Sequence, residues 1–239
     1  MDVLGCPIPD DCWVDIENEI WARPDPDGVR IALGVLASQA AFAGRYVSVR
    51  FRDLEGVVDR GRSLATLESL RTTVPFRIPM TGRVVERNAA LAVRPKLLND
   101  SPYDHGWVAR IIPTDPGDLA RLLARPAQIR EVLESRIRER RITCYPAAPD
   151  VEIYGIGSEC SATLAKLDED LTHRDAGEIV LVVTDDPTSP AEFARWSDRT
   201  GHTLLYHRRE GNLYHFLVRK EAEPHPRIRG AVTGEMPSG

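Results

Sequence analysis

The chain has 239 residues, of which 42% are hydrophobic and 28% charged, and its formal net charge is −5. This composition supplies enough apolar side chains for one or two folded domains and argues against bulk disorder. Both signs of charge are spread along the chain, so nucleic acid is not an expected partner. The sequence has no apolar run long enough to span a membrane. Its N-terminus does not resemble a signal peptide, so the cytoplasm is the expected location.

The first half of the chain is predicted to be rich in β-strands. Apolar residues alternate with polar or small ones at 29–33 and at 47–51, which is the period of a half-buried strand. Glycines separate these runs at turn-like intervals: Gly34, Gly44, Gly56, Gly61 and Gly82. Many short strands with glycine turns favour a compact β sandwich or barrel.

One stretch of this half carries a more specific pattern. Residues 67–72 read Leu-Glu-Ser-Leu-Arg-Thr, and the pattern continues through Pro-Met-Thr-Gly at 79–82 to Asn88. It then runs through 98–103 to a Gly-Trp pair at 106–107. Over about residues 11–135 the chain resembles the H protein of the glycine cleavage system. That resemblance implies a barrel-sandwich hybrid whose hairpin presents lipoate on the lysine of a Glu-Ser-Val-Lys-Ala motif.

The lysine of that motif is replaced here. Glu68, Ser69 and Leu70 fit the pattern, and Arg71 stands at the position of the lysine. Lipoylation needs a nucleophilic amine, whereas a guanidinium stays protonated with delocalised lone pairs. No lysine lies near the hairpin to substitute, so we expect no lipoate and no glycine cleavage carrier. A fixed positive charge at Arg71 is suited to docking a carboxylate or phosphate of a partner.

Two helices are predicted to close the first domain. Thr114-Asp115-Pro116 is a start signal, and Pro126 begins a second helix. The second helix has an apolar stripe that we expect to pack on the β domain: Ile129, Val132, Leu133 and Ile137. The arginine-rich run at 136–141 is interspersed with Glu134 and Glu139 and predicts a solvated face.

The second half is predicted to form an α/β two-layer sandwich. A short strand at 151–154 and a glycine turn precede a helix that begins near Cys160, and 179–183 reads as a central buried strand. A Ser-Pro-Ala-Glu capping box at 189–192 opens a second helix, which Gly201 ends. Two strands follow, at 202–206 and 213–218, giving the order β-α-β-α-β-β. The expected organisation is a first domain over 1–142, a linker over 143–150, a second domain over 151–222 and a disordered tail over 223–239.

The four cysteines suit neither a zinc site nor a disulfide framework, so each is expected to be a free thiol: Cys6, Cys12, Cys144 and Cys160. Cys144 is either a linker thiol without a role or a thiol that accepts sulfur from Cys160 or resolves it as a disulfide. His202 and His215 are either strand histidines or support for a thiolate. No metal cluster is apparent.

Cys160 is the candidate reactive residue. A thiol at the start of a helix is expected to have a lowered pKa, because unpaired N–H groups and the helix dipole stabilise the thiolate. Its surroundings, Gly157-Ser158-Glu159-Cys160 followed by the patterns at 177–187, 201–202 and 211–216, resemble the TusA-type sulfur carriers over about 70 residues. Their Gly-x-x-Cys-Pro-x-Pro motif implies that Cys160 carries persulfide sulfur.

The second half departs from that motif at three positions. Ser161 and Thr163 replace the two prolines, and Tyr154 stands where an aspartate is usual. The free N–H groups could help to hold a thiolate, or the lost motif could mean lost transfer.

Two hypotheses about function follow. In the first, Cys160 relays sulfur from a donor such as a cysteine desulfurase or rhodanese-like protein to an acceptor protein, and the first domain docks these partners. In the second, both domains are degenerate and the chain is a non-catalytic adaptor. The pKa of Cys160 distinguishes the two, since a depressed value favours transfer.

Overall fold

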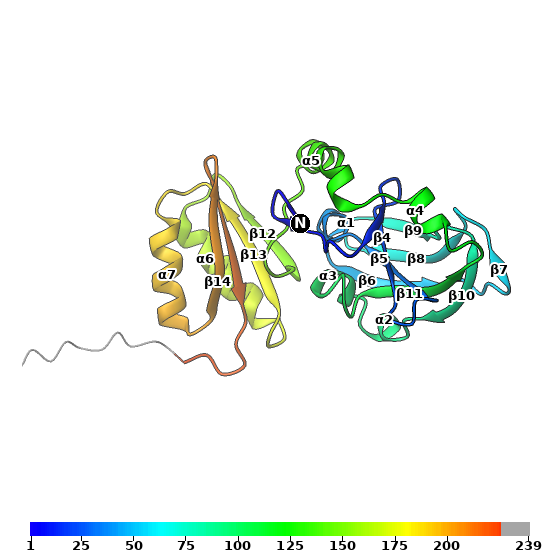
Figure 1. Cartoon of the computed structure of the whole chain (residues 1–239). Coiled ribbons are helices and arrows are strands. Elements are labelled where there is room, and N and C mark those ends of the chain that lie inside the picture. The colour runs from blue at the N-terminus through cyan, green and yellow to red at the C-terminus, as the bar shows by residue number, and fades with distance from the viewer. Residues whose placement is uncertain (226–239) are drawn as a thin grey trace, which may run out of the picture. The chain divides into compact units, whose positions relative to one another are not determined.

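A computed structural model describes residues 1–225 of the chain (Figure 1). The chain divides into two compact units between Ala148 and Pro149. The first unit contains β1 (Asp2–Val3), β2 (Cys6–Pro7), β3 (Trp13–Asp15), β4 (Ile20–Pro24), β5 (Ile31–Val35), α1 (Ala37–Ala43), β6 (Tyr46–Phe51), β7 (Val57–Val58), β8 (Ser63–Ser69), β9 (Thr73–Arg77), β10 (Gly82–Arg87), α2 (Ala90–Val93), α3 (Leu97–Asp100), β11 (Trp107–Pro113), α4 (Asp118–Leu122), η1 (Pro126–Ile129) and α5 (Arg130–Glu139). The second contains β12 (Val151–Gly155), α6 (Cys160–Thr172), β13 (Ile179–Thr184), α7 (Ser189–Thr200), β14 (Thr203–Glu210) and β15 (Leu213–Arg219).

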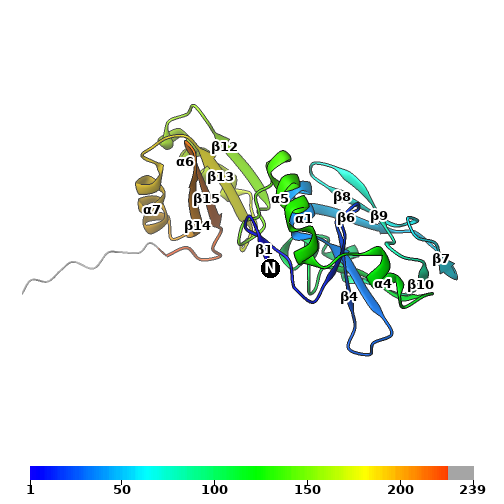
Figure 2. The same cartoon turned by 45° about the horizontal axis from the view of Figure 1, so that its top comes forward.

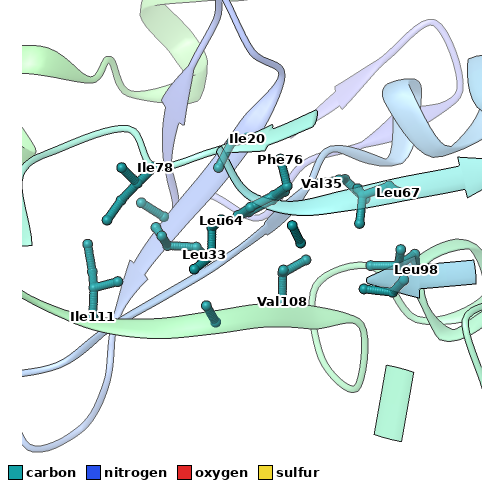
Figure 3. Packing of buried hydrophobic residues seen from close by; sticks show 14 of the residues in the cluster. Ile20, Leu33, Val35, Leu64, Leu67, Phe76, Ile78, Leu98, Val108 and Ile111 are labelled. Atoms are coloured by element: carbon teal, nitrogen blue, oxygen red, sulfur yellow. The ribbon is translucent and has the colours of Figure 1, made fainter. Parts of the chain in front are cut away.

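Two antiparallel sheets enclose the main core of the first unit. One has six strands in the order β3-β4-β5-β11-β10-β7, and the other has the order β6-β8-β9 (Figure 2). Buried side chains from both sheets meet between them (Figure 3), among them Leu33, Val108 and Ile111 from the larger sheet and Leu64, Leu67 and Phe76 from the smaller. The predicted β-rich fold of the first domain is therefore confirmed.

Two of the predicted strand faces differ from the structure. Val29 precedes β5 and is 56% exposed, so the strand itself begins at Ile31. In β6 the pairing with β8 shifts register between Tyr46 and Ser48. This irregularity turns Tyr46 and Val49 towards the core and leaves Val47 exposed, because a bulge changes which face successive side chains occupy.

The predicted second helix is present, as η1 followed by α5. Ile129, Leu133 and Ile137 are buried in a second core cluster, whereas Val132 is 50% exposed and does not belong to the packed stripe.

The arginine-rich end of α5 is not only a solvated face. Arg136 and Arg140 form ion pairs of 3.3 and 3.0 Å with the buried Glu19.

The second unit has the predicted β-α-β-α-β-β order and a sheet in the order β12-β13-β15-β14. β12 and β13 are parallel, and the other neighbours are antiparallel. Both helices pack on one face of the sheet (Figure 1), where one cluster contains Leu164, Leu167 and Leu171 of α6, Phe193 and Trp196 of α7, and Val180, Val182, Phe216 and Val218 of the sheet. The predicted two-layer sandwich is confirmed.

Local details of this unit differ from the prediction. The capping box at 189–192 is absent: the N-cap of α7 is Thr188 without a side-chain cap, and the Ser189 hydroxyl donates to the carbonyl of Asp186 at 2.7 Å. The final hairpin is tighter than expected because β14 extends to Glu210. Of the predicted disordered tail over 223–239, residues 226–239 lie outside the described part of the chain.

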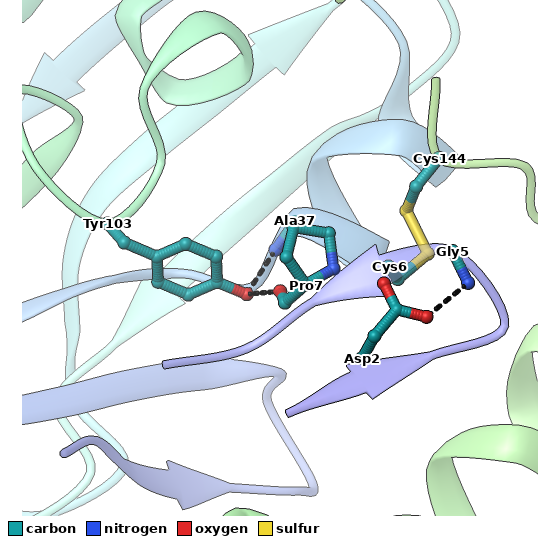
Figure 4. The surroundings of a disulfide bond; sticks show 7 residues. All are labelled: Asp2, Gly5, Cys6, Pro7, Ala37, Tyr103 and Cys144. Carbon is teal, nitrogen blue, oxygen red and sulfur yellow. Dashed lines mark hydrogen bonds between the residues drawn. A yellow bond between two sulfur atoms is a disulfide. The ribbon is translucent and has the colours of Figure 1, made fainter. Parts of the chain in front are cut away.

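The expectation of four free thiols is wrong. Cys6 and Cys144 form a disulfide with a Cα–Cα distance of 5.1 Å across a sequence separation of 138 residues (Figure 4). Close by, the Tyr103 hydroxyl donates to the Pro7 carbonyl at 2.7 Å and accepts from the Ala37 N–H at 3.0 Å (Figure 4). Cys144 is thus neither a free linker thiol nor, in this state, an acceptor for sulfur.

Candidate functional site

Cys160 lies where the sequence predicts it, at the first residue of α6. The chain leaves the parallel strand β12 at Gly155, turns through Gly157 with φ of 72°, and enters the helix at Cys160. The left-handed φ at Gly157 is one that residues with a Cβ rarely adopt, which explains glycine at this turn. The side chain of Cys160 is only 4% exposed and packs in the core between helix and sheet.

The loop after β13 supplies two carboxylates to this turn. Asp186 Oδ2 accepts a hydrogen bond from the Cys160 N–H at 2.7 Å, and Asp185 Oδ1 accepts one from the Gly157 N–H at 2.8 Å. The other oxygen of Asp186 accepts from the N–H and hydroxyl of Thr188 at 2.8 and 2.7 Å. One N–H donor at this helix start, that of Cys160 itself, is therefore engaged by a carboxylate.

These surroundings raise the pKa of Cys160, whereas its position at a helix start predicts a lowered one. Burial of the thiol, followed by the charges of Asp186 and Glu192, raises the pKa of Cys160 to about 11. The hydrogen bonds from Thr188 and from the Cys160 N–H lower the pKa of Asp186, so this carboxyl is ionised at neutral pH. A helix start does favour a thiolate, but here burial and two nearby carboxylates outweigh it. The resting thiol is neutral.

The pattern at 177–187 contains Asp185 and Asp186, but the sequence did not single them out as site residues. The order of the strands could have indicated that these aspartates lie beside Cys160. β12 and β13 are consecutive strands joined by a helix, which implies a parallel pair. The carboxyl ends of parallel neighbours lie at the same edge of a sheet, and ligand sites gather there. The Asp-Asp-Pro after β13 is thus brought beside the Gly-x-x-Cys after β12.

Neither candidate histidine supports a thiolate at this helix start. His215 lies on β15 next to Phe216, whose side chain packs against the helices, so His215 faces the opposite side of the sheet from α6. Burial and the nearby Arg208 lower the pKa of His215. His202 precedes β14 and packs beside Trp196, and burial lowers its pKa as well. Both imidazoles are therefore neutral at neutral pH.

Arg71 lies in the three-residue turn between β8 and β9, as the hairpin prediction requires. Ser69 organises the turn: its hydroxyl donates to the Ala43 carbonyl at 2.7 Å and accepts from the Thr72 N–H at 3.1 Å. The Arg71 guanidinium donates to the Phe42 carbonyl at 3.3 Å, close to the end of α1. The neighbouring Glu68 forms an exposed ion pair with Arg50 at 3.3 Å.

Comparison with known proteins identifies the first unit. A family model described as glycine cleavage H-protein matches residues 13–136, just over half of the chain. Glycine cleavage system H protein 5 of Aquifex aeolicus is 33% identical over 147 residues, which are 60% of this chain and 98% of that protein. The chain belongs to the glycine cleavage H-protein family.

Two further similarities are to other H proteins. The H protein of Thermus thermophilus is 38% identical to the chain over 128 residues, which are 54% of this chain and 97% of that protein. The crystal structure of an H protein from Mycobacterium marinum covers 53% of this chain and 98% of its own, with 25% identity and a TM-score of 0.46.

The second unit matches a different family model. A model described as sulfurtransferase TusA matches residues 156–220, so this H-protein relative is a fusion with a TusA domain. The match includes Cys160 and the loop that carries Asp186. The β8–β9 hairpin of this chain carries arginine at residue 71 and has no lysine, so it offers no amine for acylation.

Thr163, where the sequence resemblance expects the second proline of the TusA motif, is buried at 3% exposure. Its N–H donates to the Glu159 carbonyl at 3.2 Å, a bond that a proline would not make. Its side chain fills the space above Gly155, where a Cβ would lie 2.3 Å from Thr163 Oγ1. The start of α6 in this fusion protein is therefore held by a threonine–glycine contact, with Ser161 exposed to solvent.

Within residues 1–225, no helix combines the length and apolar character needed to cross a bilayer. In the same part of the chain no three His, Cys, Asp or Glu side chains cluster as metal ligands.

Proposed function

We propose that this protein is a sulfur carrier that receives a sulfane sulfur as a persulfide on Cys160 and passes it to an acceptor protein. The observation that carries the proposal is a cysteine at the first residue of α6, inside a domain that matches the TusA family. The sulfur donor would be a persulfide-bearing protein such as a cysteine desulfurase or a rhodanese-like protein.

The proposed step is a thiol–persulfide exchange. The Cys160 thiolate attacks the outer sulfur of the donor persulfide, the sulfur–sulfur bond of the donor breaks, and the donor sulfur leaves as a thiolate. One sulfur atom moves to Cys160 and no external oxidant is needed. Transfer to the acceptor repeats the exchange, with the acceptor thiolate as the nucleophile.

The buried neutral thiol implies that Cys160 must be activated before it reacts. Asp186 holds the Cys160 N–H and raises the pKa of the thiol by its charge. We infer that docking of the donor draws the Asp186 carboxylate away, which frees the N–H for a thiolate and removes a repelling charge. In this proposal the state in which Asp186 accepts the Cys160 N–H protects the thiol between transfers.

The H-protein domain is proposed to dock the partner proteins rather than to carry a cofactor. Arg71 supplies a permanent charge in the hairpin turn but no amine. Linking a docking domain to a carrier raises the effective concentration of the partner at Cys160.

The test is sulfur labelling of the full chain. The protein is incubated with a cysteine desulfurase and cysteine, persulfides are trapped by alkylation, and the cysteine peptides are mapped. We expect the trapped persulfide on the Cys160 peptide, and none on that of Cys12, the other free cysteine, which is also buried. Equal labelling of a Cys160→Ser variant, or no labelling of the wild type by this donor or by a small-molecule persulfide, contradicts the proposal.

The alternative function is a non-catalytic adaptor in which both carrier domains have lost their chemistry. The raised pKa of Cys160 favours it, as does the arginine at residue 71. The two proposals differ in two outcomes: an adaptor never carries sulfur, and it keeps its partner binding when Cys160 is replaced by serine.

A further inference from the structure

A second, separate feature lies at the end of the β8–β9 hairpin away from Arg71. Three stretches of chain meet there: Arg52 after β6, the turn before β8, and Arg77 at the end of β9. Ser63 pairs with Arg77 in the ladder, and the Arg52 N–H donates to the Leu64 carbonyl at 2.9 Å. They border an open concavity of about 760 Å³, which is lined by Arg52, Asp59, Arg60, Gly61, Arg62, Ser63, Pro75 and Arg77.

Four of the lining residues are arginines and one is an aspartate. Within residues 1–225, none of the four guanidiniums forms an ion pair with a carboxylate, whereas elsewhere in the unit arginines such as Arg30, Arg110 and Arg121 do. Unpaired like charges repel one another. In a chain whose net charge is −5, these four arginines form a local concentration of positive charge.

Several backbone groups of the turn are engaged in holding its shape. The Gly61 N–H donates to the Ile78 carbonyl at 2.8 Å, and the Arg60 N–H donates to Thr81 Oγ1 at 3.1 Å. The Arg77 guanidinium donates to the Gly61 carbonyl at 2.9 Å and ties the hairpin to the turn. The groups that remain for a ligand are therefore mainly guanidinium N–H donors, which cannot accept a hydrogen bond.

We propose that this concavity binds a small molecule that carries two phosphate groups. Guanidinium forks match phosphate oxygens in bidentate geometry, and four of them around one hollow suit a ligand with adjacent anionic groups. The volume lies within the range of small-molecule sites, roughly 300–1,000 Å³, and exceeds the need of a single phosphate. None of the eight described residues that line it is aromatic, so we expect a ligand without a base that needs stacking. The site is independent of Cys160.

The test is calorimetric titration of the full chain at low salt with inorganic pyrophosphate. We expect one site, with orthophosphate bound at least about tenfold more weakly because it offers one group in place of two. ADP should bind no more than a few-fold more tightly than pyrophosphate, because none of the lining residues offers an aromatic ring on which its base could stack. The double variant Arg60→Ala/Arg62→Ala should weaken pyrophosphate binding at least about tenfold.

The matched control is Arg83→Ala/Arg199→Ala, which removes the same charge from two exposed arginines outside the concavity. It should leave affinity within about twofold. Arg60→Lys/Arg62→Lys keeps the positive charge but loses the bidentate guanidinium geometry, so we expect an intermediate loss of affinity for pyrophosphate. Such an intermediate result also separates a binding defect of the alanine variant from a folding defect. Any of four results overturns the assignment. These are no binding of pyrophosphate, an equal loss of affinity in the control variant, tighter binding of an acidic peptide than of pyrophosphate, and binding of ADP more than about tenfold tighter than that of pyrophosphate.

Discussion

The most quantitative consequence of the structure concerns the reactivity of Cys160. A pKa of about 11 leaves roughly one thiol in 3,000 ionised at pH 7.5, against about one in eleven for an ordinary cysteine with a pKa of about 8.5. This is a deficit of about 300-fold in thiolate. A more basic thiolate is also a better nucleophile. With a Brønsted coefficient of about 0.4–0.5, each thiolate reacts roughly tenfold faster, which offsets part of the deficit. Alkylation of the free protein should therefore be at least about twentyfold slower than that of a free cysteine, and burial slows it further.

The assay is the rate of iodoacetamide labelling followed peptide by peptide, so that Cys160 and Cys12 are read separately. Because the folded pKa is raised, the labelling rate of Cys160 should climb steadily with pH through pH 10. A thiol of ordinary pKa would instead level off above about pH 9. The pKa of Cys12 is also raised to about 11, chiefly by burial, and it serves as an internal comparison.

Asp186→Asn isolates the contribution of the carboxylate. The amide can still accept the Cys160 N–H through its oxygen, but the charge is gone. Labelling of Cys160 should quicken by about threefold for each unit by which the pKa falls. The pKa should stay above its ordinary value, because burial is the larger cause. Asp175→Asn, an exposed aspartate of the same unit, is the control and should change nothing. Rapid labelling of the wild type at pH 7.5, or equal rates in the two variants, refutes the reasoning.

Three further predictions concern other parts of the chain. Arg71→Lys should accept a lipoyl group when coexpressed with a lipoyl ligase, because the turn already has the carrier shape and lacks only the amine; a lipoyl mass on the wild-type hairpin would contradict this. Cys6→Ser/Cys144→Ser should lose up to about 4 kcal/mol of unfolding free energy, since the disulfide closes a long loop; a denaturant midpoint equal to that of the oxidised wild type would show that the bond contributes nothing. Gly155→Ala should destabilise the second unit by about 1–3 kcal/mol through contact with Thr163, and adding Thr163→Ala should restore part of the loss in thermal melts, whereas additive losses would exclude that contact as the cause.

Much of the fold could be predicted because hydrophobic periodicity reports directly on burial. The run at 179–183 and the leucines of α6 proved to be core elements for this reason. Local irregularity was harder: the register shift in β6 moved Val47 to the surface, and nothing in the strand pattern signals a bulge. The Cys6–Cys144 disulfide was missed because its proximity comes from the tertiary fold of the whole first unit, which cysteine spacing does not encode.

The candidate site was predicted in position but not in electrostatics. Placing Cys160 at a helix start needs only local sequence, and the structure agrees. The sign of its pKa shift depends on burial and on Asp186 and Glu192, which approach from the loop after β13 and from α7. Such contacts across elements decide whether a helix start actually stabilises a thiolate, and a one-dimensional pattern does not contain them.

The most direct test of the sulfur-carrier proposal is the intact mass of the full chain after incubation with a cysteine desulfurase and cysteine. The account predicts a species heavier by one sulfur atom, which a thiol reductant removes and which Cys160→Ser lacks. Sulfur that remains on Cys160→Ser, or a wild-type mass that does not change with either a protein or a small-molecule persulfide donor, would contradict it.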